Sequence, residues 1–201
     1  MEQPRAIDRT LRLLARKGVL RPKDLAEHGL PRVTLTRLVE QGLVERVGRG
    51  LYVLAGAEPS EHRSLVEAAT RVPHGVVCLL SALAFHGLTT QAPRQVWMAI
   101  PTNARRPRTR QPPLRVVRMA AEAHGYGVKR HRIEGVTVPV YTVAKTVADC
   151  FKFRGRIGQD IAVEALREAL SSRTATRDAI WRAAGVCRVK AVMRPYLEAI
   201  G

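Results

Sequence analysis

Residues 31–41 carry side chains that can recognise the edges of base pairs. Arginine can pair with guanine and glutamine with adenine, and the methyl groups of valine and threonine suit the methyl group of thymine. The stretch offers six side chains for this chemistry: Arg32, Val33, Thr34, Thr36, Arg37 and Gln41. This composition predicts a segment that contacts the major groove of DNA.

A helix from about Pro31 to Gly42 must position these side chains. At about 100° per residue, Leu35, Leu38 and Val39 fall on one side, where they should pack on a first helix over roughly residues 4–17. The opposite side then presents the base-contacting residues to solvent. The alternative is an ordinary solvated face in a winged-helix module that binds another protein.

Residues 19–54 as a whole have the pattern of a winged helix-turn-helix. A short helix over 22–28 precedes the base-contacting helix, and Gly29 ends it. Two β-type runs on either side of Gly48-Arg49-Gly50 predict the hairpin called the wing. Arg46 and Arg49 place positive charge on this hairpin, where it can contact phosphate groups.

The charge of the whole chain also favours a polyanionic partner. The chain has 34 Lys and Arg against 17 Asp and Glu, a net charge of +17. Residues 101–132 hold nine basic residues and one acidic residue. We predict that this tract is a second phosphate-contacting surface; the alternative is a solvated surface. Four of its residues lie in a Pro-rich loop over 101–113 and five on β-like segments: Arg105, Arg106, Arg108 and Arg110, then Arg115, Arg118, Lys129, Arg130 and Arg132.

Other features argue against several classes of protein. No apolar run reaches the roughly 18 residues of a membrane span, and the N-terminal segment is an amphipathic helix unlike a signal peptide. We therefore expect a cytoplasmic protein that does not bind a membrane. Cys78, Cys150 and Cys187 are far apart among apolar residues, which favours buried thiols. We expect no cofactor and no metal site.

The order of apolar patterns predicts an α+β protein of two domains. Residues 1–56 form the winged helix-turn-helix DNA-binding domain. Residues 60–201 form a mixed α/β domain that includes the basic loop and ends in a helical tail. Strands are expected over about residues 95–100, 114–119, 129–133 and 136–141, the last two as a hairpin around Glu134-Gly135.

Three segments carry a resemblance to a known family. They run from Leu30 to Tyr52, from Leu80 to Leu88 with 93–101, and from Tyr141 to Phe151 with 158–166. Over nearly its whole length the sequence resembles the AbiEi antitoxins of type IV toxin–antitoxin systems. The long Arg/Pro tract at 101–113 is where it departs from them.

The resemblance implies two activities. The winged helix would repress its own operon by binding inverted repeats in the promoter. The protein would be a monomer in solution, and two copies would pair on the DNA. The C-terminal domain, an AbiEi-like antitoxin domain, would counter a co-encoded nucleotidyltransferase toxin without forming a stable complex with it. No catalytic residue is implied.

One helix face near residue 150 is a candidate surface for the antitoxin activity. Lys145, Asp149 and Lys152 recur at spacings of four and three, so they share a face on which Lys145 and Asp149 can pair. The candidate antitoxicity surface is Lys145, Asp149, Lys152, Arg154, Arg156 and Asp160. The alternative is a surface ion pair without a further role.

Two other functions compete with this interpretation. A nuclease would need clustered acidic residues on adjacent strands to hold a metal ion, and the strand candidates offer none. A repressor of unrelated genes that responds to a small ligand is the stronger alternative. The neighbouring reading frame would distinguish it from an antitoxin.

Overall fold

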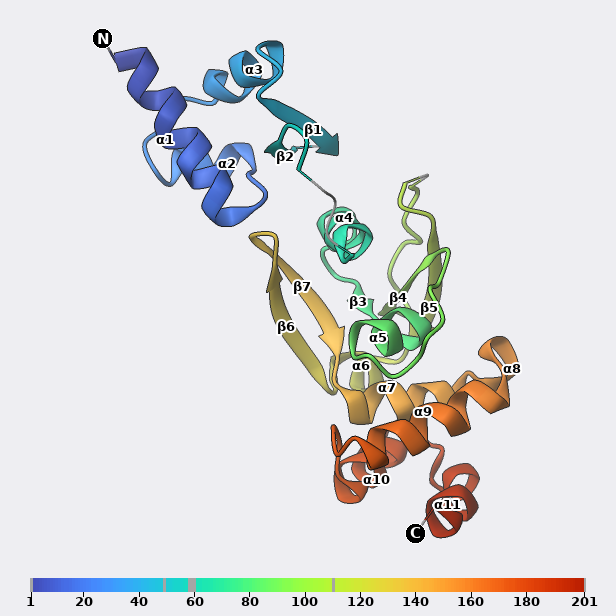
Figure 1. The fold of residues 1–201 in the computed structure, drawn as a ribbon. Coiled ribbons are helices and arrows are strands. Elements are labelled where there is room, and N and C mark those ends of the chain that lie inside the picture. Colours follow the sequence, from blue (N-terminus) through green and yellow to red (C-terminus); the bar gives the residue numbers. More distant parts are fainter. Residues whose placement is uncertain (1, 49, 58–60, 110, 201) are drawn as a thin grey trace. The chain divides into compact units, whose positions relative to one another are not determined.

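The computed structural model describes residues 2–48, 50–57, 61–109 and 111–200. The chain divides into two compact units. The first comprises residues 1–66 together with Arg132–Val136, and the second comprises Glu67–His131 with residues 137–201. Figure 1 labels the helices and strands of both units. In the described ranges no helix is long and apolar enough to cross a membrane.

The first unit contains three helices and a two-stranded antiparallel hairpin. Their bounds are α1 (Glu2–Lys17), α2 (Pro22–Ala26), α3 (Val33–Glu40), β1 (Val44–Gly48) and β2 (Leu51–Leu54). Leu20 pairs with Tyr52 and so adds a bridge to the hairpin. This order confirms the helix-turn-helix followed by a wing.

Leucines from every helix form the core of the first unit. Leu14 of α1, Leu25 of α2 and Leu38 of α3 are fully buried in one cluster. The start of α2 is fixed by Asp24, whose Oδ2 accepts a hydrogen bond of 2.7 Å from the backbone N–H of Arg21. Burial alone would raise the pKa of Asp24, but the hydrogen bonds from Arg21 outweigh it and hold this pKa below its ordinary value.

The second unit is built on a five-stranded sheet of order β5-β4-β3-β7-β6. β3 pairs antiparallel with β4 and parallel with β7, and β4 pairs parallel with β5. The strands are β3 (Val76–Val77), β4 (Val96–Pro101), β5 (Leu114–Met119), β6 (Val128–Ile133) and β7 (Val136–Tyr141). The four expected strands are therefore present, and the α+β class is confirmed.

Helices complete the second unit, and α7 lies at the centre of their packing. It packs against α5, α9, α10 and α11, and residues 145–151 are all buried. The helices after the sheet form the C-terminal tail seen in orange and red in Figure 1. The helices that follow the wing in the chain are α4 (Arg63–Arg71), α5 (Leu79–Phe85), α6 (Ala121–Gly125), α7 (Val143–Lys152), α8 (Arg154–Ile157), α9 (Gln159–Ser171), α10 (Arg177–Val186) and α11 (Lys190–Ala199).

Candidate nucleic-acid interface

The free face of α3 carries most of the predicted base-contacting residues. Arg32, Val33, Thr36, Arg37 and Gln41 are exposed, and Val33 keeps 50% of its surface accessible. At about 100° per residue, Val33, Thr36 and Arg37 lie within one sector opposite the buried side. Glu40 lies in the same sector and is also exposed.

Two assignments on α3 are wrong. Thr34 was expected on the free face, but only 4% of its surface is accessible. Val39 was expected to pack inward, but 37% of its surface is accessible. Leu35 and Leu38 define the buried side, and at about 100° per residue Thr34 lies next to Leu38 on that side while Val39 lies beyond its edge. Thr34 therefore cannot contact bases without movement of α3.

The wing places one described arginine next to the hairpin turn. Arg46 is exposed on β1, and its Nε donates a hydrogen bond of 3.3 Å to the carbonyl oxygen of Gly48. The strand pairing shifts between Arg46 and Gly48, as in a β-bulge. Arg49, the second predicted phosphate contact of the wing, lies outside the described residues.

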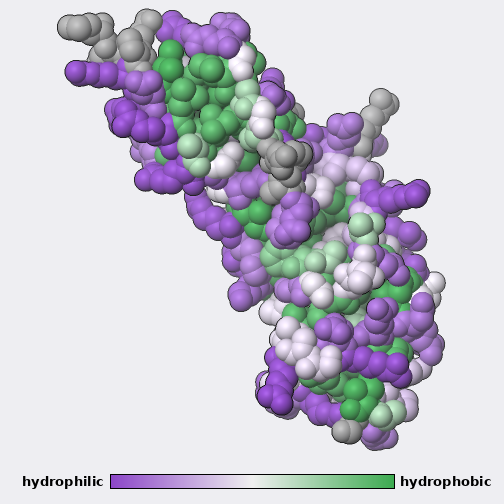
Figure 2. Space-filling model, in the orientation of Figure 1, coloured by the Kyte–Doolittle hydropathy of each residue, from purple (hydrophilic) through white to green (hydrophobic). Residues whose placement is uncertain are grey.

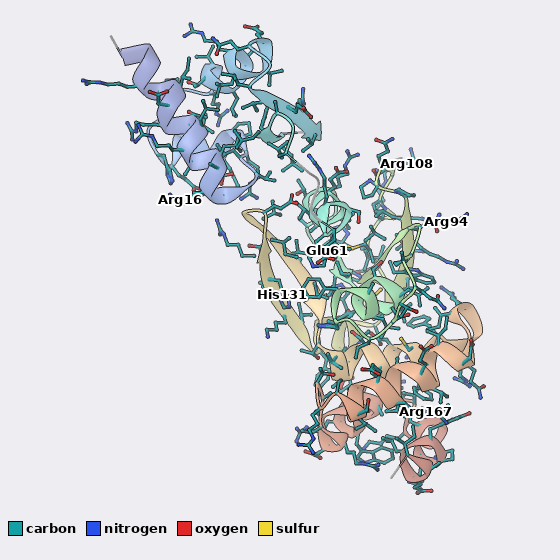
Figure 3. All side chains as sticks on the ribbon, in the orientation of Figure 1. Arg16, Glu61, Arg94, Arg108, His131 and Arg167 are labelled. Atoms are coloured by element: carbon teal, nitrogen blue, oxygen red, sulfur yellow. The ribbon has the colours of Figure 1, made fainter. Side chains whose placement is uncertain are left out.

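The basic tract of residues 101–132 is not one surface. Arg115 and Arg118 lie on β5, whereas Lys129, Arg130 and Arg132 lie on β6. These strands are the opposite edges of the sheet, and four strand spacings separate them by about 19 Å. Figure 3 shows Arg108 in the loop before β5 and His131 on β6. The basic residues of this tract, although close in sequence, therefore lie at two separate edges of the sheet.

The arginines on the β5 side are exposed but partly anchored. Arg105, Arg106 and Arg108 are exposed in the loop that precedes β5, and Arg110 lies outside the described residues. On β5 itself, the Arg115 guanidinium stacks 4.6 Å from the ring centre of Trp97, and Arg118 Nη2 lies 3.5 Å from the Ala104 carbonyl oxygen. Because these contacts already hold the two side chains in place, the side chains lose less conformational entropy when they bind a phosphate group.

Lys145 and Asp149 are not on a surface, which corrects the expectation for this pair. Both side chains are completely buried, and the Lys145 Nζ lies 2.6 Å from each carboxylate oxygen of Asp149. The ammonium also lies 4.1 Å from the ring centre of Tyr141. Cys187 donates from its Sγ to Asp149 Oδ1 at 3.3 Å. The i,i+4 spacing correctly predicted the pair but not the neighbours that cover it.

The burial of this pair shapes the protonation of its surroundings. Burial raises the pKa of Asp149, and the Lys145 ammonium opposes that shift. Burial also raises the pKa of the Cys187 thiol to about 12 and the pKa of the Cys78 and Cys150 thiols well above their usual range. The three cysteines are free and buried, as predicted. Across the described side chains, no group of three His, Cys, Asp or Glu could hold a metal ion.

The other members of the candidate antitoxicity surface divide into two kinds. Lys152 Nζ donates to the Cys187 carbonyl oxygen at 3.0 Å, and Arg154 Nη1 donates to the Phe151 carbonyl oxygen at 2.8 Å. These two side chains stabilise the end of α7. Arg156 and Asp160 are exposed, and Asp160 lines an open groove of about 1040 Å³ along α9, α10 and α11.

Comparison with known proteins places the first unit. Residues 8–55 match the family described as transcriptional regulator, AbiEi antitoxin. This segment is therefore similar to the AbiEi antitoxin regulators. The match agrees with the resemblance seen in the sequence for the winged helix, and the matched residues include α3.

The fold of the chain is similar to that of a solved protein structure. The crystal structure of RV2827C protein from Mycobacterium tuberculosis matches with a TM-score of 0.61 and 16% sequence identity. The match covers 98% of this chain and 78% of that chain. At this identity the likeness establishes the fold alone. No curated protein matches the chain.

The buried pair predicts an asymmetric response to substitution. Asp149→Asn should destabilise the second unit by about 3–5 kcal/mol, because it leaves the Lys145 ammonium buried without a counterion. Replacing both residues by apolar ones, Lys145→Met with Asp149→Leu, should restore most of that stability. Urea denaturation followed by circular dichroism measures both changes. Equal losses in the single and double variants would contradict the argument.

Proposed function

We propose that this protein is a DNA-binding autorepressor and the antitoxin of a type IV toxin–antitoxin system. The exposed face of α3 within the segment that matches AbiEi antitoxin regulators supports this proposal most strongly. The winged helix binds inverted repeats in the promoter of its own operon. The protein is a monomer in solution, and two copies pair on the repeats.

In this proposal α3 enters the major groove. Arg37 pairs with a guanine, Gln41 with an adenine, and the methyl groups of Val33 and Thr36 contact thymine. Arg32 at the start of α3 lies in the groove with them. Arg46 and Arg49 of the wing contact phosphate groups and fix the orientation of the helix. Thr34 has no part in base recognition, because it is buried.

Basic residues at the two edges of the five-stranded sheet add phosphate contacts. Arg105, Arg106 and Arg108 lie in the loop before β5, and Arg115 and Arg118 on β5 continue this set. We include Arg110 in the set from its place in the sequence. Lys129, Arg130 and Arg132 form a separate basic set at the β6 edge. Both sets strengthen binding to any duplex, because phosphate groups carry no sequence information.

The second unit also carries the antitoxin activity. It counters a co-encoded nucleotidyltransferase toxin without a stable complex. Lys152, Arg156 and Asp160 are the exposed members of the candidate surface. Lys145 and Asp149 support it from the core. The protein has no enzymatic activity in this proposal and acts in the cytoplasm.

The groove beside α9 favours a second candidate function. Its lining mixes carboxylates, guanidinium groups and apolar side chains, among them Glu164, Arg167 and Arg177. Such a lining suits a small polar ligand, which supports a ligand-responsive repressor of unrelated genes. A nucleotidyltransferase gene beside the coding sequence would favour the antitoxin, and its absence would favour the repressor.

The first prediction concerns base recognition by α3. Arg37→Ala should weaken binding to the operator by about 1–3 kcal/mol and change binding to random duplex little, because a lost guanine contact matters only where the guanine is present. Fluorescence anisotropy with both duplexes measures this. Val39→Ala, on the exposed flank of the same helix, is the matched control and should bind as wild type. Equal losses on both duplexes would exclude base recognition by Arg37.

The second prediction concerns the loop at the β5 edge. Changing Arg105, Arg106, Arg108 and Arg110 to Gln should weaken operator and random duplex by similar factors. It should flatten the slope of log affinity against log salt by up to about four units, at 0.9 per phosphate. The set of Lys129, Arg130 and Arg132 changed to Gln tests the other edge separately. An unchanged slope would mean that the loop does not contact phosphate groups and is an ordinary solvated surface.

The third prediction separates repression from protection. With the toxin expressed from an independent promoter, Arg37→Ala should still protect cells, because α3 acts on DNA only. Arg156→Ala and Asp160→Ala should lose protection while their operator affinity stays at the wild-type value. Arg182→Ala, an exposed change on α10, is the control. Protection lost with Arg37→Ala and kept with the other two would overturn the division.

A further inference from the structure

Helix α1 carries a stripe of arginines that base recognition by α3 does not use. Arg5, Arg9, Arg12 and Arg16 are all exposed and recur at spacings of four, three and four. At about 100° per residue they fall within a sector of about 60°. We call them the arginine stripe. Figure 2 shows hydrophilic side chains over the outer side of the first unit around α1, and Figure 3 labels Arg16.

No described side chain neutralises the arginine stripe. Lys17 of the same helix pairs with Asp24 at 3.8 Å, whereas no ion pair joins the four arginines to a described acidic residue. Their one side-chain hydrogen bond within the described part of the chain runs from Arg9 Nη2 to the His28 carbonyl oxygen at 3.4 Å. Like charges at these spacings destabilise an isolated helix, and Asp8, three residues after Arg5 and four before Arg12, offsets only part of this repulsion because it is one carboxylate beside four guanidinium groups. The stripe therefore has a cost that an anionic partner would remove.

Two hollows border the arginine stripe, and one of them reaches α3. The first, of about 530 Å³, is lined by Arg5 and Arg9 of the stripe and by Val33 and Arg37 of α3. The second, of about 300 Å³, is lined by Arg9, Arg12 and Arg16 with His28. Arg9 belongs to both hollows. The cations thus form a continuous series that begins beside the base-contacting face.

The spacing of these cations suits a strand of DNA. Arg5 and Arg16 are separated by about 16 Å along the helix axis. Duplex DNA presents one phosphate per 3.4 Å of axis on each strand, and successive phosphates lie farther apart along the winding strand itself. A strand that follows the stripe therefore still offers more than one phosphate to the four arginines. Guanidinium groups match phosphate oxygens in a bidentate geometry.

We propose that the arginine stripe binds the phosphate backbone of the duplex whose base pairs α3 contacts. This inference rests on the proposed function, because it requires α3 to lie in the major groove. The stripe supplies affinity on any sequence, and α3 supplies the choice of sequence. The hollow beside α3 also has Ile7 and Leu30 in its lining, so the apolar stems of Arg5 and Arg9 can pack there while their guanidinium groups contact the strand.

The test compares two variants of the full-length protein that lose the same charge. One carries Arg9→Gln, Arg12→Gln and Arg16→Gln, and its control carries Arg182→Gln, Arg188→Gln and Arg194→Gln, three exposed arginines of the second unit. Fluorescence anisotropy from 50 to 200 mM KCl measures operator and random duplex. The stripe variant should lose at least about tenfold in affinity on both duplexes, with a slope flatter by up to about 2.7 units. The control should keep the wild-type slope.

A third variant and a parallel measurement separate the possible outcomes. Arg9→Lys, Arg12→Lys and Arg16→Lys should restore most of the slope, because the charges remain. Circular dichroism confirms that each variant is folded. Equal losses in the stripe and control variants would mean that net charge alone acts, which overturns the inference. Normal DNA binding with lost protection from the toxin would assign the stripe to a protein partner and would also overturn it.

Arg37→Ala distinguishes this inference from the proposed function. If Arg37→Ala loses operator binding while the stripe variant binds as wild type, the proposed function stands and the stripe inference fails. If the wild-type protein binds neither duplex, the proposed function itself fails.

Discussion

The architecture of the second unit depends on the buried ion pair between Lys145 and Asp149. The ammonium lies 2.6 Å from both carboxylate oxygens, 3.8 Å from the Met119 sulfur and 4.1 Å from the Tyr141 ring centre. Asp149 in turn accepts from Cys187. One pair therefore contacts β5, β7 and the residue that follows α10. Because two charges lose their hydration here, we expect the pair to add little net stability, and we infer from its contacts that it helps to fix the arrangement of these elements.

The close fit around Lys145 shows how strictly that arrangement is set. A Cβ atom on Gly127 would lie 2.7 Å from Lys145 Cβ, and Gly127 has a φ of +68°, so no other residue fits there without strain. The Tyr141 hydroxyl donates to the His124 carbonyl oxygen at 2.9 Å and holds the chain before Gly127. With α7 fixed under the sheet, the two sheet edges keep their basic side chains outward. Such charged edges also prevent pairing with strands of other molecules.

Local patterns in the sequence predicted the elements well, because each rests on short-range physics. The leucine spacing predicted α1 and α3. The Glu134-Gly135 pair predicted the hairpin of β6 and β7, and both of its residues have a positive φ. Burial was harder to predict. Helical spacing put Lys145 and Asp149 on one face, but the covering residues Tyr141 and Cys187 come from other elements. Likewise strand order, which places β5 and β6 at opposite edges, depends on long-range pairing that no local pattern encodes.

A net charge of +17 creates a problem of selectivity for a regulator. Each phosphate contact strengthens binding to every duplex, so sequence choice must come from a few side chains held in a defined position. In the first unit, Leu35 and Leu38 anchor α3 in the leucine core, and Arg37 is the basic residue at the middle of its exposed face. Glu40 on that face can accept from cytosine and disfavours a nearby phosphate. Under the proposed function, the leucine core that holds α3 in place is what lets a strongly basic chain discriminate between sequences.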